Sequence, residues 1–271
     1  MENNYILYAC GCRGSWPVSG PEFDEFGGST TCFIVKTGTH ALVIDCGTGL
    51  YNAGPILADC TKIDVALTHL HYDHVLGLLD FGVFPRTAEL IFHSTFKRWF
   101  GEKTFDEFFR SPFWPVVPAW GKLSEVEQIN VPIDLGDGLS VAFYGAPHPD
   151  YGNILVIRAG KEKITLMADY EHNGFFEREA VEGCSLLVYD GMYCDEEYEK
   201  HMGWGHSTWQ EGCRLAEILR PRQILITHHD PHRTDSQLRR MEQQAKEEFR
   251  NVPVHFSRSG EKLDLDGIGV L

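Results

Sequence analysis

The chain has 271 residues, of which 43% are hydrophobic, and its 39 acidic and 24 basic residues give a formal net charge of −15. This composition suits a substantial core and excludes a low-complexity chain. A membrane span of roughly 20 apolar residues is missing, and the start at Met1–Asn4 lacks the basic residues of a signal peptide. We therefore expect a cytoplasmic protein that makes no membrane contact.

No Ser/Gly-rich linker, charge block or repeat marks a boundary, so residues 1–271 are interpreted as one α/β domain. The eight cysteines are mostly dispersed in or beside apolar segments, as small buried thiols would be. Cys10 and Cys12 form the only close pair. No second pair completes a metal site with them, which favours packing over metal or redox chemistry.

The first half of the chain predicts strands that are interrupted by short turns. Strands are expected near residues 5–9, 32–36 and 41–45, and a short helix follows Gly49. The apolar run Ile63–Leu67 predicts a further buried strand. Val75–Leu79 then predicts the opening of a helix.

Four residues that can bind metals lie between this strand and this helix, within the sequence Thr68-His69-Leu70-His71-Tyr72-Asp73-His74. His69 and His71 are two residues apart in an extended segment, so their side chains share a face. Asp73 and His74 follow the turn into a second position. The spacing thus offers two imidazoles to one ion and a carboxylate plus an imidazole to a neighbouring ion. Such ligands suit zinc, iron or manganese.

Residues 92–120 are unusually rich in aromatic residues and are interrupted by Pro112, Pro115 and Pro118. Aromatic residues at helical spacing usually serve burial, which favours core packing or a homodimer interface. The alternative is a lid against which a planar ring could stack.

The second half predicts strands at 153–157, 164–168 and 224–227, and helices at 175–182, 207–219 and 237–249. Thr208 and Glu211 have the spacing of a capping box for the middle helix, and Pro221 ends it. The mixed charges from Arg239 to Arg250 are typical of a solvated helix face.

The cluster at residues 69–74 resembles the HxHxDH signature of the metallo-β-lactamase superfamily. The resemblance implies a third histidine before a strand, which His148 supplies, and a bridging carboxylate at the end of the next strand, which Asp169 supplies. It also implies a last histidine after a later strand, where His228 fits better than His229. The implied metal ligands are His69, His71, Asp73, His74, His148, Asp169 and His228.

The same resemblance implies an αββα sandwich, in which two mixed sheets flanked by helices hold metals at their open edge. In this superfamily, an acid at the position of Asp45 supports a ligand histidine and fixes its tautomer. A strand-ending aspartate that caps a turn is an equally good interpretation of Asp45.

Three short sequences resemble the ribonuclease Z and cyclic phosphodiesterase branch of the superfamily. They are Gly205-His206-Ser207-Thr208, Gly11–Ser15 and Gly27–Thr31. In that branch the histidine at the position of His206 faces the reacting phosphate, which implies a catalytic role for His206. The alternative is a helix-terminal residue with an idle ring.

The implied chemistry is hydrolysis by two divalent metal ions through a metal-bridging hydroxide. Asp73 would orient the water as well as bind metal, and His206 would act as general acid or oxyanion partner. Zinc is the first choice, with iron or manganese open. The acidic balance disfavours long nucleic acid, and the chain lacks a segment resembling the basic arm of ribonuclease Z. A small or cyclic phosphodiester is therefore the expected substrate, although some ester and lactone hydrolases share these ligands.

A non-hydrolytic alternative remains. Flavodiiron proteins use the same fold to hold two irons, and a lone domain of that type would bind or sense oxygen and pass the signal to a partner. Their signature has glutamate where this chain has His71, which favours hydrolysis.

Overall fold

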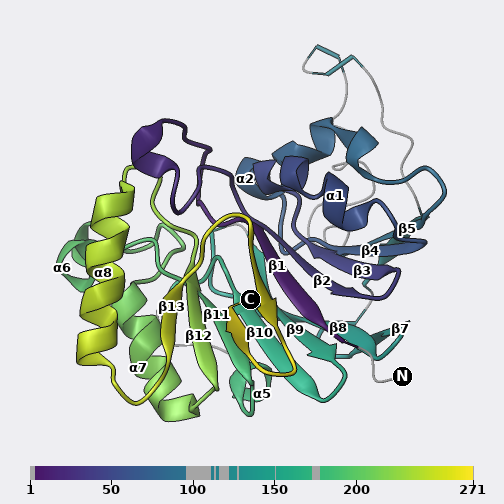
Figure 1. Ribbon diagram of the computed structural model, residues 1–271. Helices are drawn as coiled ribbons and strands as arrows, with labels where there is room; N and C mark the ends of the chain where they lie inside the picture. The colour runs from purple at the N-terminus through teal and green to yellow at the C-terminus, as the bar shows by residue number, and fades with distance from the viewer. Residues whose placement is uncertain are drawn as a thin grey trace.

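The computed structural model describes residues 4–95, 111–112, 114–115, 122–126, 128–149, 151–172 and 178–270. Two sheets pack against each other, and helices cover their outer faces (Figure 1). The predicted αββα sandwich of two mixed sheets is thus confirmed. Most of the aromatic segment 92–120 lies outside the described residues, so the choice between lid, core and interface stays a prediction.

The first sheet has eight strands in the order β15-β14-β1-β2-β3-β4-β5-β6. Neighbours from β15 to β3 are antiparallel, whereas β3 to β6 are parallel. The strands are β1 (Ile6–Gly11), β2 (Cys32–Thr37), β3 (His40–Ile44), β4 (Lys62–Ala66), β5 (Glu89–Ser94), β6 (Lys122–Glu125), β14 (Glu261–Asp264) and β15 (Gly269–Val270).

The second sheet has seven strands in the order β13-β12-β11-β10-β9-β8-β7. Here β10 to β13 are parallel and β7 to β10 are antiparallel. The strands are β7 (Ile133–Gly136), β8 (Leu139–Ala146), β9 (Gly152–Ala159), β10 (Glu162–Met167), β11 (Leu186–Asp190), β12 (Gln223–Thr227) and β13 (Val254–Phe256).

Two long helices, α7 and α8, lie along the outer face of the second sheet (Figure 1). The described α-helices are α1 (Gly54–Leu57), α2 (Tyr72–Val75), α5 (Arg178–Val181), α6 (Asp195–Tyr198), α7 (Trp209–Leu219) and α8 (Asp235–Glu248). Half of the predicted capping box of α7 is present, because Thr208 accepts a hydrogen bond from the backbone N–H of Glu211, whereas the Glu211 side chain pairs with Arg214. A left-handed Arg220 ends the helix directly before Pro221.

The helix expected after the metal-binding signature is only one turn of α2, followed by a tighter 3-10 turn over Leu76–Leu79. Gly77 explains part of this geometry. Its N–H donates to the carbonyl of Cys46, and a Cβ at this position would lie 2.1 Å from the carbonyl oxygen of Gly47. The segment is thus held against the loop after β3 rather than continuing as a regular helix.

Apolar side chains fill three layers, because alternate residues of each strand face opposite sides. Leu42 and Ile44 of β3 join a core between the two sheets, whereas Ala41 and Val43 face the layer beneath α1. A third layer packs the second sheet against α7 and α8. The inter-sheet core takes side chains from both halves of the chain, and one domain over residues 1–271 remains the prediction.

The eight cysteines are free, and seven of them are buried, which agrees with their interpretation as packing residues. Across the described residues, no helix combines the length and apolar character that crossing a bilayer requires.

Candidate metal centre

The predicted site residues meet at one edge of the sandwich, where strands end and helices begin. His69 and His71 follow β4, whereas Asp73 and His74 lie in α2. The second sheet supplies the others from the segments after β8, β10 and β12 and before α7: His148, Asp169, His228 and His206. Strand ends from both sheets therefore bring together residues that are up to 159 positions apart, from 69 to 228.

Three histidines form the first group. One ring nitrogen of each of His69, His71 and His148 lies within 4.8 Å of the others. His148 Nε2 is 3.1 Å from His71 Nδ1, and the ring centroids of His69 and His148 are 4.8 Å apart. Three converging imidazoles are a common ligand set for a transition-metal ion.

The second group consists of Asp73, His74 and His228, whose ligand atoms also lie within 4.8 Å of one another. Asp169 adjoins both groups. Its Oδ2 is 2.7 Å from His74 Nε2, and its Oδ1 is 3.2 Å from His228 Nε2 and 4.0 Å from His148 Nε2. This is the position that a carboxylate shared by two ions would occupy.

The hydrogen bonding of the donor atoms is also consistent with a metal site. Several buried side-chain atoms make no hydrogen bond of normal geometry within the described part of the chain, and four of them belong to this cluster: His69 Nε2, His74 Nε2, His228 Nε2 and Asp169 Oδ2. Of these, His74 Nε2 and Asp169 Oδ2 face each other as an ion pair. Buried polar atoms without a partner are costly, so a native site normally satisfies them with water or an ion. The gathering of four such atoms in one cluster is therefore a sign of a cation site.

The charge state of the histidines points the same way. Burial lowers the pKa of His69 and His148, and it lowers that of His228 to about 4, so these rings are neutral at neutral pH and keep a lone pair for a metal. His74 differs. Burial opposes its protonation, but Asp169, Asp73 and other carboxylates raise its pKa well above the ordinary value. A divalent ion would neutralise this concentration of negative charge.

Hydrogen bonds behind the ligands hold the rings in place. The other nitrogen of His148 lies 2.9 Å from the carbonyl oxygen of Gly205, and Nδ1 of His228 lies 3.2 Å from the Thr31 hydroxyl. Such partners fix the tautomer of a ligand histidine and aim its remaining nitrogen at the ion.

Asp45 plays this part for His74, with its Oδ2 2.8 Å from Nδ1 of the ring. It also accepts hydrogen bonds from the backbone N–H and the hydroxyl of Thr68. One carboxylate thus makes the contacts that both interpretations of Asp45 expect, with a histidine of the cluster and with the turn after β4.

We predict that Asp45→Asn weakens metal binding by about 10- to 100-fold, the usual cost of losing such a partner. Asparagine tolerates the left-handed backbone of Asp45, whose φ is 55°, so the fold should survive. Chelator competition would measure the affinity, with the exposed Asp59→Asn as the control. Unchanged affinity in Asp45→Asn would show that Asp45 serves only the turn.

Gly14 allows the N-terminal segment to pass close to the cluster. A Cβ on Gly14 would lie 2.5 Å from Nε2 of His228 and 2.6 Å from the terminal methyl of Met192. Next to it, the backbone N–H of Ser15 donates to Oδ2 of Asp73 over 2.8 Å. The glycine therefore lets this segment approach both side chains without displacing His228.

His206 lies beside the cluster, with 12% of its side chain exposed. Its Nδ1 is 2.9 Å from Asp190 Oδ2 and 3.6 Å from Asp169 Oδ1. Burial opposes protonation of His206, but Asp190 outweighs it and raises the pKa of His206 to about 9. Since Asp190 engages Nδ1, Nε2 is the atom that could meet a substrate.

Asp190 was missed in the sequence. It ends β11 and is fully buried, and it accepts further hydrogen bonds from the backbone N–H groups of Tyr170 and Met192. Burial raises the pKa of Asp190 to about 6. A carboxylate directly after the apolar run Leu186–Tyr189 was the available signal, since Asp169 follows β10 in the same way.

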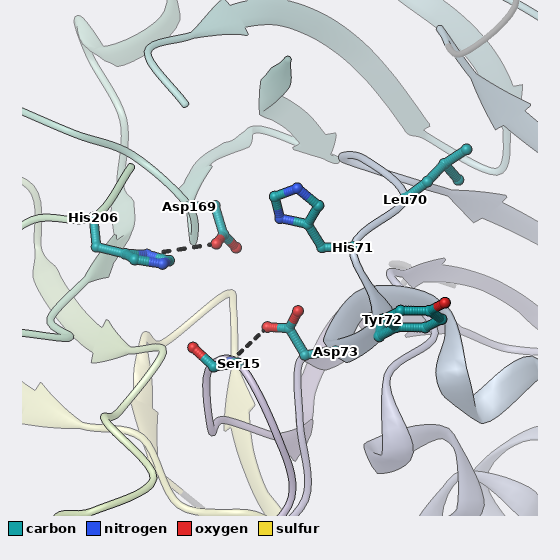
Figure 2. A pocket seen from close by; sticks show the side chains of 7 residues that line it. All are labelled: Ser15, Leu70, His71, Tyr72, Asp73, Asp169 and His206. Carbon is teal, nitrogen blue, oxygen red and sulfur yellow. Dashed lines mark hydrogen bonds and ion pairs between the residues drawn. The ribbon is translucent and has the colours of Figure 1, made fainter. Parts of the chain in front are cut away.

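The cluster opens into a cavity of about 410 Å³. Figure 2 shows His71, Asp73, Asp169 and His206 around this space, with Ser15 and Tyr72 also on its lining. His229, the discarded candidate, lies elsewhere: its Nε2 is 2.9 Å from the carbonyl oxygen of Ser257, and its ring stacks on Phe256. The structure thus brings all eight predicted residues together and separates His229 from them.

Two mixed sheets between helices, with imidazoles and carboxylates gathered at their open edge, define a protein of the metallo-β-lactamase fold. Residues 40–229 match the model of the β-lactamase superfamily domain, and the chain belongs to this superfamily. Membership supports a metal-dependent hydrolase.

Two curated proteins illustrate the similarity. The chain is 29% identical over 154 residues to a ribonuclease Z of Myxococcus xanthus, a match that covers 56% of this chain and 44% of that protein. The match therefore spans less than half of that relative. The chain is also 22% identical over 269 residues to the probable metallo-hydrolase YhfI of Bacillus subtilis, covering 92% of this chain and 96% of YhfI.

Solved structures show the same fold. The crystal structure of YhfI from Bacillus subtilis superposes with a TM-score of 0.69 at 17% identity, over 97% of this chain and 100% of that one. A structure described as a new diphosphatase from the PhnP family gives a TM-score of 0.68 at 18% identity, over 96% of each chain.

Proposed function

We propose that the protein is a dinuclear-metal phosphodiesterase that acts on a small or cyclic phosphodiester. The observation that carries this proposal is the position of Asp169, whose two oxygens face His74 and His228 beside the three-histidine group. The relatives named ribonuclease Z and PhnP-family diphosphatase support phosphate ester chemistry.

The ligands divide between two ions. His69, His71 and His148 would hold the first ion, and Asp73, His74 and His228 the second, with Asp169 shared by both. Two bound divalent ions supply a hydroxide nucleophile near neutral pH and neutralise charge on the phosphoryl oxygens. The donor set suits zinc best, whereas iron and manganese also accept these ligands.

Two further side chains shape the reaction. One oxygen of Asp73 accepts a hydrogen bond from the backbone N–H of Ser15. This contact fixes the carboxylate, which could then orient the attacking water. His206 would face the phosphate from the opposite side and donate a proton to the leaving oxygen or stabilise the developing charge. Asp190 acts through His206, since it holds the ring by Nδ1.

The cavity and the charge of the chain favour a small substrate. The residues that line the cavity of about 410 Å³ include no lysine or arginine among those described. With a net charge of −15, the chain would repel a long polyanion, whereas a single phosphodiester needs only the metal ions to balance its charge.

Metal analysis of protein purified without added metal, combined with turnover of bis(p-nitrophenyl) phosphate, tests this proposal. We expect about two ions per chain and metal-dependent release of p-nitrophenol. A coloured aerobic preparation without turnover, whose absorption band changes with oxygen, would instead support the di-iron oxygen sensor. A chain that holds no tightly bound metal would contradict both functions.

A further inference from the structure

A second cavity of about 170 Å³ adjoins the metal centre. It shares Ser15 and His206 with the larger cavity, so the two spaces meet at the side of the centre that His206 occupies. A ligand whose phosphate lies at the metal ions could therefore extend past His206 into this second space.

Aromatic rings dominate its wall. Trp16 is 49% exposed and Trp204 is 60% exposed, although both are large apolar side chains. Trp16 meets the ring of His232 edge to face at 5.2 Å, and Trp204 meets His201 in the same manner at 5.0 Å. His201 in turn stacks on Tyr193, with 4.2 Å between ring centroids. Large apolar rings left exposed around a cavity are typical of a ligand-binding surface.

Trp204 is held in place before any ligand arrives. The two oxygens of Glu171 accept the backbone N–H groups of Gly203 and Gly205, which flank the tryptophan on both sides. The N–H of Trp204 itself donates to the carbonyl of His201. Because this segment is fixed at three backbone groups, little ordering would accompany binding.

Both tryptophans are also tied to the metal centre through their neighbours. Ser15, next to Trp16, donates its N–H to Asp73, and Gly205, next to Trp204, offers its carbonyl to His148. The distance from the aromatic wall to the ions is therefore set by short stretches of backbone. This arrangement suits one ligand that spans both cavities.

The side chains that line the second cavity limit the kinds of ligand that it could bind. No lysine or arginine is among its described lining residues, which include Asp230 and the three histidines His201, His206 and His232. An uncharged ring would meet apolar and aromatic surfaces there and would need no cation to balance a charge.

We propose that this second cavity binds a planar aromatic ring carried by the substrate, either a nucleobase or a simple aryl group, while the phosphodiester lies at the metal ions. The inference rests on the proposed phosphodiesterase function and makes it more specific. Trp16 and Trp204 are then the residues that determine specificity. Stacking on such side chains accepts many kinds of planar ring. An experiment must therefore distinguish a nucleobase from an aryl group.

Calorimetric titration of the metal-loaded protein with two matched pairs of monophosphates tests the inference. AMP and ribose 5-phosphate differ only by the base, and phenyl phosphate and methyl phosphate differ only by the ring. We expect the member with the ring to bind about tenfold more tightly in at least one pair, in line with the usual gain from stacking. The pair that shows the gain identifies the ring.

Variants of Trp16 and Trp204 would show whether these side chains cause the gain in affinity. Trp16→Ala and Trp204→Ala should each remove most of the difference within a pair, whereas Trp204→Phe should keep much of it. Ile218→Ala, which truncates a 77% exposed apolar side chain on α7, is the matched control and should change nothing. Metal content and circular dichroism would verify that each variant is folded.

The outcomes separate this inference from the proposed function. If ribose 5-phosphate and methyl phosphate bind as tightly as AMP and phenyl phosphate, the ring site is wrong and the phosphate site stands. The ring site is also wrong if the gain persists in both alanine variants. If none of the four compounds binds to protein that holds two metal ions, the phosphodiesterase proposal fails, and the ring site fails with it.

Discussion

Replacing Asp169 with alanine is expected to remove both metal ions from the centre and to abolish turnover. Asp169 adjoins His74, His228 and His148, so its loss would take a ligand from each of the two proposed ions. The loss in metal affinity should exceed the roughly 100-fold that a partner behind a ligand can contribute. Metal content after dialysis and turnover of bis(p-nitrophenyl) phosphate would measure the effect.

Asp59→Ala is the matched control for this change, because its carboxylate is 66% exposed and lies outside the cluster. It should retain both ions. Two tightly held ions in Asp169→Ala would refute the bridging position, whereas one retained ion would assign Asp169 to a single site.

Replacing His206 with alanine is expected to lower turnover by about 10²- to 10⁴-fold while leaving the metal content near two ions per chain. The ring stacks on His228 with 4.9 Å between the ring centroids, and its Nδ1 is held by Asp190. A substrate with a better leaving group should recover part of the rate in this variant, because protonation of the leaving oxygen then matters less. Metal analysis and rate comparison over a series of aryl leaving groups would test both statements.

His255→Ala provides a control histidine away from both cavities, since it lies on β13 and pairs with Glu242 and Glu261. Its effect on turnover should be far smaller than that of His206→Ala. Loss of one ion in His206→Ala would place the ring among the ligands, a role its distance of 3.6 Å from Asp169 also permits.

Short-range patterns in the sequence predicted an α/β class and the cluster at residues 69–74, whereas the αββα sandwich was implied by the resemblance to the metallo-β-lactamase superfamily. The run Ile63–Leu67 has the apolar character of a buried strand, and β4 covers residues 62–66. The spacing of His69, His71, Asp73 and His74 fixes which side chains point together as the chain leaves that strand. The likeness to a superfamily signature then indicated where His148, Asp169 and His228 would lie.

The supporting contacts could not be predicted in this way, because they join segments that are distant in the chain and lack any period. Asp190 meets His206 only because β11 ends beside the turn before α7. Glu171 fixes the segment around Trp204 by accepting backbone N–H groups, which any residue types could donate. Trp16 and Trp204 line one cavity although 188 positions separate them, from 16 to 204.

The most direct test of the central claim is a crystal structure of the metal-loaded protein with anomalous diffraction data at the absorption edge of the bound metal. We expect two anomalous peaks. One should lie about 2.0–2.1 Å from a nitrogen of each of His69, His71 and His148, and the other at similar distances from His74 and His228, if the metal is zinc. Oxygens of Asp169 should coordinate both ions. A single peak, or peaks outside this cluster, would contradict the dinuclear centre on which the proposed chemistry depends.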